Sequence, residues 1–185
     1  NGSVVEYYIH ASDDDGNHVY NPHSAPEIPH FFLVGTSAFF PTLIFEDAET
    51  EQGWSLGIPG DNATAGIWIR DEPIGTWEGL EPVQPDEDHS PTGSMCFVTG
   101  NAPFDGSNTG AGDVDGGRTT LESPVYPIPP GISPVISFWR WYSNDLGDTP
   151  AQDNWEVQIR DQNNVWISLE KTTQSDNSWT EHQFL

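Results

Sequence analysis

Residues 135–142 read VISFWRWY, a run in which only Ser137 and Arg140 are strongly polar. Because successive side chains of a strand point to opposite faces of a sheet, this run presents apolar side chains on both faces. A strand of that kind is expected in the middle of a sheet, with cover on both sides. The run therefore predicts a central β-strand.

Two segments that follow show the pattern of a hairpin. Residues 155–160 read WEVQIR and alternate between apolar and polar side chains, which is typical of a half-buried strand. Residues 165–169 read VWISL, and the intervening DQNN of residues 161–164 consists of turn-forming side chains. Residues 67–69 and 95–99 are further strand candidates.

Helical signals are nearly absent from the chain. Its 18 Gly and 16 Pro divide the 185 residues into short runs, and none of these runs keeps a helical period over several turns. Short strands separated by Gly- and Pro-rich turns predict an all-β fold, an antiparallel β-sandwich with very little helix.

The first 36 residues differ in pattern from the rest. In order they hold a strand-like run (residues 5–11), a turn-rich run (12–17), a Pro- and His-rich linker (21–30) and a second apolar run (31–34). This order resembles the last two strands of an immunoglobulin-like or fibronectin-like domain, which cannot form a core alone. We therefore expect residues 1–36 to be the remnant of such a domain plus a linker. The main domain is expected over residues 43–185, with its C-terminal end truncated.

The charge of the chain excludes one large class of partner. Five Lys and Arg stand against 29 Asp and Glu, a formal net charge of −24. Nucleic acids are bound through cationic side chains that neutralise phosphates, so we expect no nucleic-acid partner. Anionic membranes are disfavoured for the same reason, and no apolar run approaches the ~18 residues of a spanning helix. Eight Trp among 12% aromatic residues argue against a disordered acidic tail.

Such acidity has two interpretations. It can serve solubility, or some of the carboxylates can converge on a hard cation such as calcium. Cys96 is the only cysteine, so the chain has no internal disulfide, and a calcium ion would be a plausible substitute for one. Cys96 lies in an apolar run, where we expect a buried, unreactive thiol.

Sequence motifs of enzymes are missing. The chain has no His-Glu-x-x-His, Gly-x-Ser-x-Gly, phosphate-binding loop or Cys-x-x-Cys. A pair of carboxylates for glycoside hydrolysis remains open, but 29 acidic residues guarantee that some pair has a suitable separation. We therefore expect no catalytic activity.

Oxygen-rich loops are the stronger signal, because calcium takes six to eight oxygen ligands. The alternative for each loop is that its carboxylates are merely solvated. The run Asp13 to Asn17 resembles the start of a calcium-binding loop, but its Gly comes too early and no closing Glu follows, so a turn between strands is the better interpretation. The candidate calcium ligands are Glu46, Asp47, Asp88, Asp113, Asp115 and Asp153.

Exposed Trp side chains are a further signal, because flat rings stack on the apolar faces of sugars. Trp77 lies in a Gly-rich loop and is the best candidate for exposure, whereas Trp139 and Trp141 share a strand face and are expected in the core. Packing remains the alternative for Trp77 as well. The polar partners expected near it in a ligand site are Asp86 and His89.

Several pieces in order resemble a MAM-type adhesion module. Phe45-Glu46-Asp47, Gly53-Trp54, Trp68-Ile69-Arg70 and the run from Asp88 to Gly93 resemble its first half. The run from Leu121 to Pro124 and residues 136–142 resemble its second half. The same order occurs in cleaved-adhesin-type domains attached to secreted peptidases and surface proteins of marine bacteria, and the resemblance covers about residues 43–185.

The resemblance implies a jelly-roll sandwich of two antiparallel sheets, concanavalin-like, in a secreted or cell-surface setting. It implies a structural calcium ion held by Glu46, Asp47, Asp88 and Asp153. It also implies adhesion or substrate targeting rather than catalysis, with a glycan or a cell-surface protein as partner, next to other domains of a parent chain. The chain departs from the animal modules by lacking their cysteines, and its Gly/Asp-rich residues 100–117 have no counterpart in the pattern.

Three functions follow as alternatives. The first is a non-catalytic, calcium-stabilised adhesion or targeting module that binds glycan or protein. The second is a carbohydrate-active jelly-roll enzyme using a carboxylate pair, and the third is a structural spacer beside a peptidase. A groove lined by aromatic side chains would favour the first, and a cleft with two carboxylates, one of raised pKa, would favour the second.

Overall fold

The protein is all-β. A computed structural model describes residues 2–22, 25–35, 41–147 and 149–185, and within these ranges fifteen strands form seven small sheets and no helix occurs. No helix in this described part is thus long and apolar enough to cross a membrane. Six sheets are antiparallel throughout, and the seventh contains one parallel pair.

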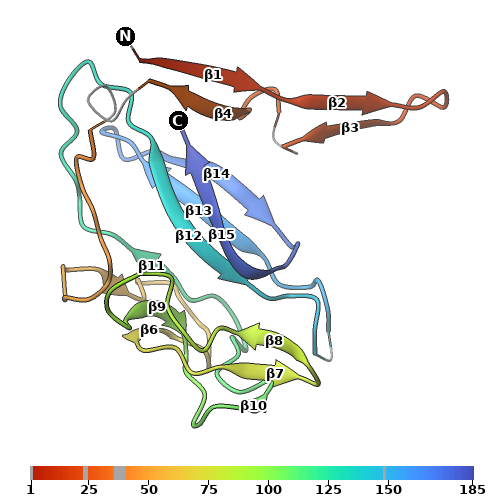
Figure 1. Cartoon of the computed structure of the whole chain (residues 1–185), viewed down its shortest axis with the longest axis vertical. Coiled ribbons are helices and arrows are strands. Elements are labelled where there is room, and N and C mark those ends of the chain that lie inside the picture. Colours follow the sequence, from red (N-terminus) through yellow and green to blue (C-terminus); the bar gives the residue numbers. More distant parts are fainter. Residues whose placement is uncertain (1, 23–24, 36–40, 148) are drawn as a thin grey trace.

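Two ribbons near the C-terminus carry the longest strands (Figure 1). β12 (Ile136–Tyr142) pairs with β15 (Asp176–Phe184), and β13 (Trp155–Arg160) pairs with β14 (Trp166–Thr172). The predicted alternation of β13 is confirmed, because its apolar residues are partly buried and its polar ones exposed. Its hairpin turn is also confirmed, since Asp161 accepts the backbone N–H of Val165 and Asn164 has a positive φ.

The middle of the chain forms three smaller sheets. β6 (Trp68–Asp71) pairs with β9 (Cys96–Thr99), so the strand candidates at residues 67–69 and 95–99 are neighbours. In the second sheet, β5 (Ser55–Leu56) pairs with β11 (Leu121–Glu122). In the third, β7 (Thr76–Glu78) lies between the antiparallel β8 (Glu81–Gln84) and the parallel β10 (Ser107–Asn108).

The Gly/Asp-rich residues 100–117 pack closely on the middle of the chain. The backbone N–H of Thr64 donates to the carbonyl of Asp115 over 2.7 Å, and Ala65 forms a bridge with Asp115. Gly66 lies so close to the backbone of Asp113 and Val114 that it leaves no space for a side chain. This segment is therefore an integral part of the fold.

The N-terminal segment forms an arm of two antiparallel ribbons (Figure 1). β1 (Ser3–Tyr7) pairs with β4 (His30–Val34), and β2 (Ile9–Ser12) pairs with β3 (His18–Asn21). The turn predicted at residues 12–17 is confirmed, because Asp13 accepts the backbone N–H groups of Asp15 and Asn17. Residues 36–40, which make up most of the expected boundary at residues 35–43, lie outside the described residues. Residues 23–24 of the expected linker also lie outside them.

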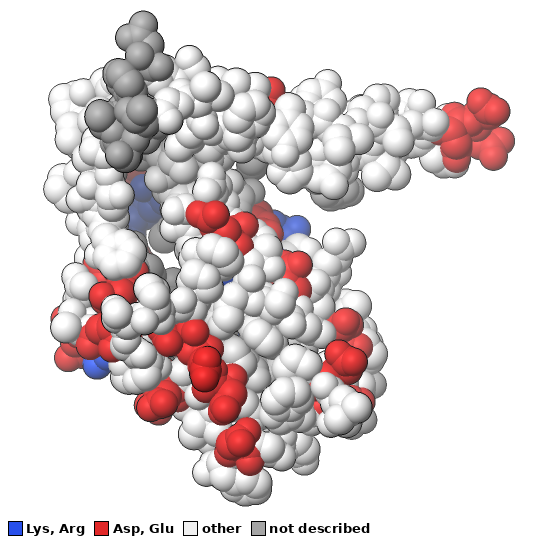
Figure 2. All heavy atoms as spheres, in the orientation of Figure 1, with Lys and Arg blue, Asp and Glu red and all other residues white. Residues whose placement is uncertain are grey.

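The hydrophobic core is small. The molecule exposes 12301 Å², whereas a compact monomer of this size exposes about 8,800 Å². Carboxylates are scattered over the face shown in Figure 2 and gather at the tip of the arm, with few cationic side chains between them. The hydrophobic residues that form the buried core among those described are Ala25, Val98, Ala102 and Leu169.

One expectation about the strands is wrong. Residues 135–142 were expected in the centre of a sheet, but β12 has β15 as its single hydrogen-bonded neighbour in the described structure. Its apolar character on both faces has another cause. One face lies toward β13 and β14, and the other contacts Val83 on β8 and the ring of His89 after it. Both faces are therefore partly covered although one edge is unpaired.

Candidate functional site

The two faces of the β12–β15 ribbon carry different chemistry. Arg140 and His182 lie on one face, where they meet the side chain of Glu170 on β14. Trp141 on β12 and Trp179 on β15 lie on the other face, with their ring centroids 6.2 Å apart and their planes at 79°. Strand alternation explains the division, because neighbouring residues point to opposite faces.

The second face forms one wall of a pocket. The pocket is a shallow depression of about 320 Å³, largely open to solvent, and it lies between the β12–β15 ribbon, the β7–β8 hairpin and the segment that follows β8. We call it the aromatic pocket, and it is lined by Trp77, Pro82, Gln84, Pro85, Asp86, Glu87, Asp88, Trp141 and Trp179.

Hydrogen bonds hold the indole rings of the aromatic pocket in place. Trp141 donates its Nε1–H to the carbonyl of Val83 over 2.8 Å, and Trp179 donates its Nε1–H to the carbonyl of Glu87 over 3.1 Å. Both rings are therefore fixed against the backbone that carries the opposite wall. Trp77 lies on β7 and not in a loop, which corrects the expectation from the sequence, and 39% of its surface is exposed as expected.

Asp86, Glu87 and Asp88 form the acidic edge of the aromatic pocket, and hydrogen bonds also hold this edge in place. Asp86 Oδ1 accepts the backbone N–H of Gly75 over 3.0 Å, and Asp88 Oδ2 accepts the backbone N–H of Ser90 over 2.9 Å. The buried Thr76 accepts the backbone N–H of Gln84 through its hydroxyl, which fixes β7 against β8. The arrangement places three successive carboxylates beside three indoles.

The residues proposed from the sequence as a ligand site lie close together. Trp77 and Asp86 both line the aromatic pocket. His89 lies beside it, with its ring 3.7 Å from that of Trp139 in a stacked arrangement and 6.0 Å from that of Trp179. Trp139 is 44% exposed, which corrects the expectation that it belongs to the core.

Sequence reasoning missed Trp141 and Trp179 as pocket residues. Trp141 was expected in the core, and Trp179 was given no role. The spacing of two residues between Trp139 and Trp141 puts both rings on one strand face, but it does not distinguish a core face from a pocket wall. No local signal pairs either ring with residues 83–88, because that contact joins segments more than fifty residues apart.

Three of the six candidate calcium ligands are engaged in hydrogen bonds within the fold. Glu46 accepts the hydroxyl of Tyr126 over 2.8 Å, and burial together with this carboxylate raises the pKa of Tyr126 to about 12. Asp47 accepts the backbone N–H of Glu49, and Asp88 that of Ser90. Each carboxylate thus already has a structural partner.

The other three candidates lie near one another. Partial desolvation raises the pKa of Asp113 from its ordinary value, and the charges of Asp115 and Asp153 raise it further. Within the described residues, however, no group of three or more His, Cys, Asp or Glu side chains is arranged to hold a metal ion. The six residues therefore do not form one ligand set in this structure.

Cys96 also lies among carboxylates. Burial raises the pKa of its thiol to about 12, and the charges of Asp88, Asp71 and Glu49 add to the shift. A thiol with so high a pKa is protonated at neutral pH and a poor nucleophile. This agrees with the expected unreactive thiol.

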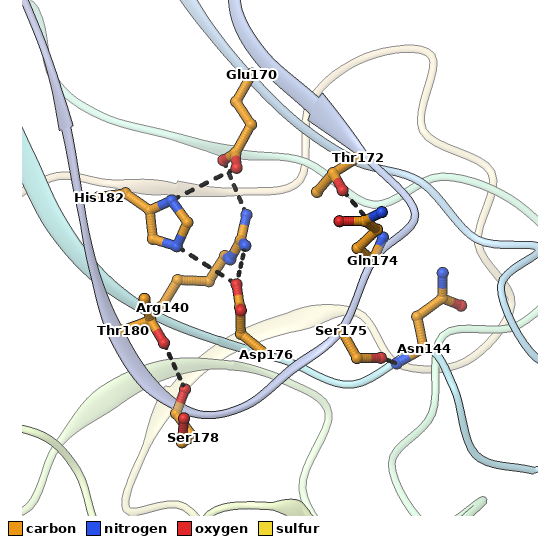
Figure 3. A network of polar contacts seen from close by, with 10 residues as sticks. All are labelled: Arg140, Asn144, Glu170, Thr172, Gln174, Ser175, Asp176, Ser178, Thr180 and His182. Atoms are coloured by element: carbon orange, nitrogen blue, oxygen red, sulfur yellow. Dashed lines mark hydrogen bonds and ion pairs between the residues drawn. The ribbon is translucent and has the colours of Figure 1, made fainter. Parts of the chain in front are cut away.

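The other face of the β12–β15 ribbon holds a charged network (Figure 3). The guanidinium of Arg140 contacts Glu170 Oε2 over 2.8 Å and Asp176 Oδ2 over 2.5 Å, and its side chain is 3% exposed. The His182 ring lies beside the same two carboxylates, 3.5 Å from Glu170 and 3.7 Å from Asp176. The network ties β12, β14 and β15 together.

This network predicts a dependence of stability on pH. Desolvation and the charge of Arg140 lower the pKa of His182 below its ordinary 6.5, and they outweigh Glu170 and Asp176, which act in the opposite direction. The unfolded chain then binds more protons than the folded one below about pH 6.5, so the free energy of unfolding falls as the pH falls through this range. We expect His182→Phe to reduce this fall between pH 7.5 and 5.5 in urea unfolding. An unchanged fall would contradict the assignment to His182.

Comparison of the chain with protein-family models, with curated proteins and with solved structures finds no match in any of the three. The resemblance to MAM-type modules therefore stays a hypothesis. The aromatic pocket is the structural feature from which a function can be proposed.

Proposed function

We propose that this protein is a non-catalytic binding module whose aromatic pocket holds a glycan or a protein surface. The observation that carries the proposal is the gathering of Trp77, Trp141 and Trp179 around one cavity of about 320 Å³. Indole rings bind the apolar faces of sugars and are frequent anchors of protein interfaces. Two of the three rings are held in place before any ligand arrives, which lowers the entropy lost on binding.

The proposed setting is a secreted or cell-surface protein with a role in adhesion or targeting. The MAM-like jelly roll and the neighbouring immunoglobulin-like remnant at residues 1–36 are part of this proposal. The two antiparallel ribbons of residues 136–184, which meet at the Arg140 network, support a layered β arrangement. The spacer remains the alternative if no ligand is found.

The alternative of a glycoside hydrolase is less well supported. Such an enzyme is expected to have a cleft with two carboxylates, one of them with a raised pKa. Asp113 has a raised pKa and Asp115 lies near it, but neither lines the aromatic pocket. The carboxylates that do line it belong to three consecutive residues on one side.

The direct test is a glycan array probed with the protein at high surface density. We expect Trp77→Ala to weaken binding about fivefold, because stacking on one ring contributes about 1 kcal/mol. Trp166→Ala is the matched control, since Trp166 is 46% exposed and does not line the pocket. Release of reducing sugar from an arrayed polysaccharide would support the enzyme, and equal losses in both variants would remove the pocket from the proposal.

Calcium dependence is a separate prediction. The charges of Asp115 and Asp153 raise the pKa of Asp113, so a cation bound beside Asp113 would relieve this repulsion and raise the melting temperature. We expect calcium to raise the melting temperature relative to chelator, and Asp113→Asn to remove the response. In chelator, Asp113→Asn is expected to melt above the unsubstituted protein, because the substitution removes one of the repelling charges. Melting curves that coincide with calcium and with chelator would refute the prediction.

A further inference from the structure

We infer that the aromatic pocket selects a positively charged group, and that its ligand is an oligosaccharide with free amino groups. The inference rests on the proposed binding function and adds the chemical class of the ligand. It combines the indole rings with the charge of the pocket's edge. Neither feature alone would identify the ligand.

The first step is the charge of the pocket. Asp86, Glu87 and Asp88 contribute three carboxylates, and none of the described lining residues is Lys or Arg. Arg140 is on the same strand as Trp141, but it lies on the opposite face, where Glu170 and Asp176 pair with it. The carboxylates at the pocket therefore have no cationic partner in its lining.

The second step is the hydrogen-bonding capacity of this edge. Asp86 and Asp88 each use one oxygen for a backbone N–H, and the other oxygen of each makes no hydrogen bond to a described residue. The Glu87 side chain makes none to a described residue either, while its backbone carbonyl accepts from Trp179. The edge thus offers acceptors without donors, and an ammonium group supplies three donors and the matching charge.

The third step is the contribution of the rings. The face of an indole is electron-rich and attracts a cation placed within about 6 Å of the ring centre. Trp141 and Trp179 stand nearly perpendicular to each other at the acidic edge. Their N–H groups are occupied by the backbone carbonyls of Val83 and Glu87, so these two rings meet a ligand through their faces and carbon edges.

The size of the cavity favours a sugar over a lysine side chain. At about 320 Å³ it falls near the lower end of the ~300–1,000 Å³ typical of small-molecule sites, which suits a ring-sized group. A pyranose ring with an ammonium substituent can place its C–H face on an indole and its charge beside the carboxylates. A lysine tip would use the charge and little of the aromatic surface.

The experiment compares two oligosaccharides that differ in one substituent. Hexamers of β-1,4-linked glucosamine and of N-acetylglucosamine are titrated into the protein by calorimetry, at a pH at which the free amines are protonated. We expect the amino form to bind about tenfold more tightly. Spermine, which carries charge but no ring, is the ligand control and is expected to bind more weakly and to be insensitive to Trp77→Ala.

The matched protein variants are Glu87→Gln and Glu51→Gln. Both remove one negative charge, but Glu87 lines the pocket whereas Glu51 is exposed elsewhere. Glu87→Gln is expected to weaken binding of the glucosamine hexamer several-fold and to leave binding of the N-acetylglucosamine hexamer unchanged. Glu51→Gln is expected to change the binding of neither hexamer. Equal effects of the two variants would show attraction to the overall charge and overturn the inference.

The remaining outcomes separate the inference from the proposed function. Equal binding of the two hexamers, with loss in Trp77→Ala, would overturn the cation preference and leave a glycan-binding module. Binding of a lysine-rich peptide without either hexamer would overturn the glycan and favour a protein ligand. No binding of any arrayed glycan or peptide would overturn the proposed function itself.

Discussion

Replacement of Arg140 by Met is expected to lower the free energy of unfolding by about 3–5 kcal/mol. The substitution leaves the carboxylates of Glu170 and Asp176 close together without their cation. It also removes the guanidinium from the rings of Tyr142 and Trp155, whose centroids lie 5.7 and 5.3 Å away. Denaturation by urea, followed by Trp fluorescence, measures the loss.

The control for Arg140 is an exposed ion pair of the same type. Arg160 contacts Glu122 over 3.2 Å, and its side chain is 38% exposed. Arg160→Met is expected to cost about 1 kcal/mol or less, because solvent screens such pairs. A triple variant that adds Glu170→Gln and Asp176→Asn to Arg140→Met should regain part of the lost free energy of unfolding, since these two carboxylates are then no longer left without their cation. A loss in Arg140→Met no larger than that in Arg160→Met would show that the network does not stabilise the fold.

The second large effect is expected from Gly66→Ala. Gly66 has a φ of 63°, and a Cβ there would lie 2.5 Å from the Cα of Val114 and against the carbonyl oxygen of Asp113. The left-handed conformation costs an Ala about 1–2 kcal/mol, and the displaced backbone adds about 1–3 kcal/mol. We therefore expect a loss of about 2–5 kcal/mol in the free energy of unfolding.

Gly79 separates the two contributions to that loss. Its φ of 65° matches that of Gly66, but no atom lies within 4 Å of the position of its Cβ. Gly79→Ala should therefore show the conformational cost alone, about 1–2 kcal/mol. If both variants lose the same amount in chemical denaturation, the close approach of the segment around Asp113 to Gly66 does not occur in solution.

The parts of the fold that the sequence predicts are those encoded by neighbouring residues. The strand of residues 155–160 follows from strict alternation, and the turns after Ser12 and at Asp161 follow from Asp side chains that bond the backbone two to four residues later. These interactions do not depend on the rest of the molecule, so local patterns are sufficient to identify them.

The candidate site depends on contacts that no local pattern encodes. Trp77 and Asp86 could be proposed from the Gly- and Pro-rich sequence around them, but the rings that complete the pocket come from β12 and β15. The run at residues 135–142 illustrates the limit. Its sequence indicates packing on both faces of the strand, which is correct only in part because Trp139 is 44% exposed, and such packing does not determine how many strands pair with the edges.

The hydrogen bonds of Trp141 and Trp179 have a consequence for molecular discrimination. Stereoisomers of a sugar differ in the direction of their hydroxyl groups, and fixed hydrogen-bond donors and acceptors distinguish one such direction from another. Both of these indole donors are already bonded to Val83 and Glu87. These two rings would therefore separate ligands by charge and flatness, and any discrimination between epimers would depend on the carboxylates of Asp86, Glu87 and Asp88.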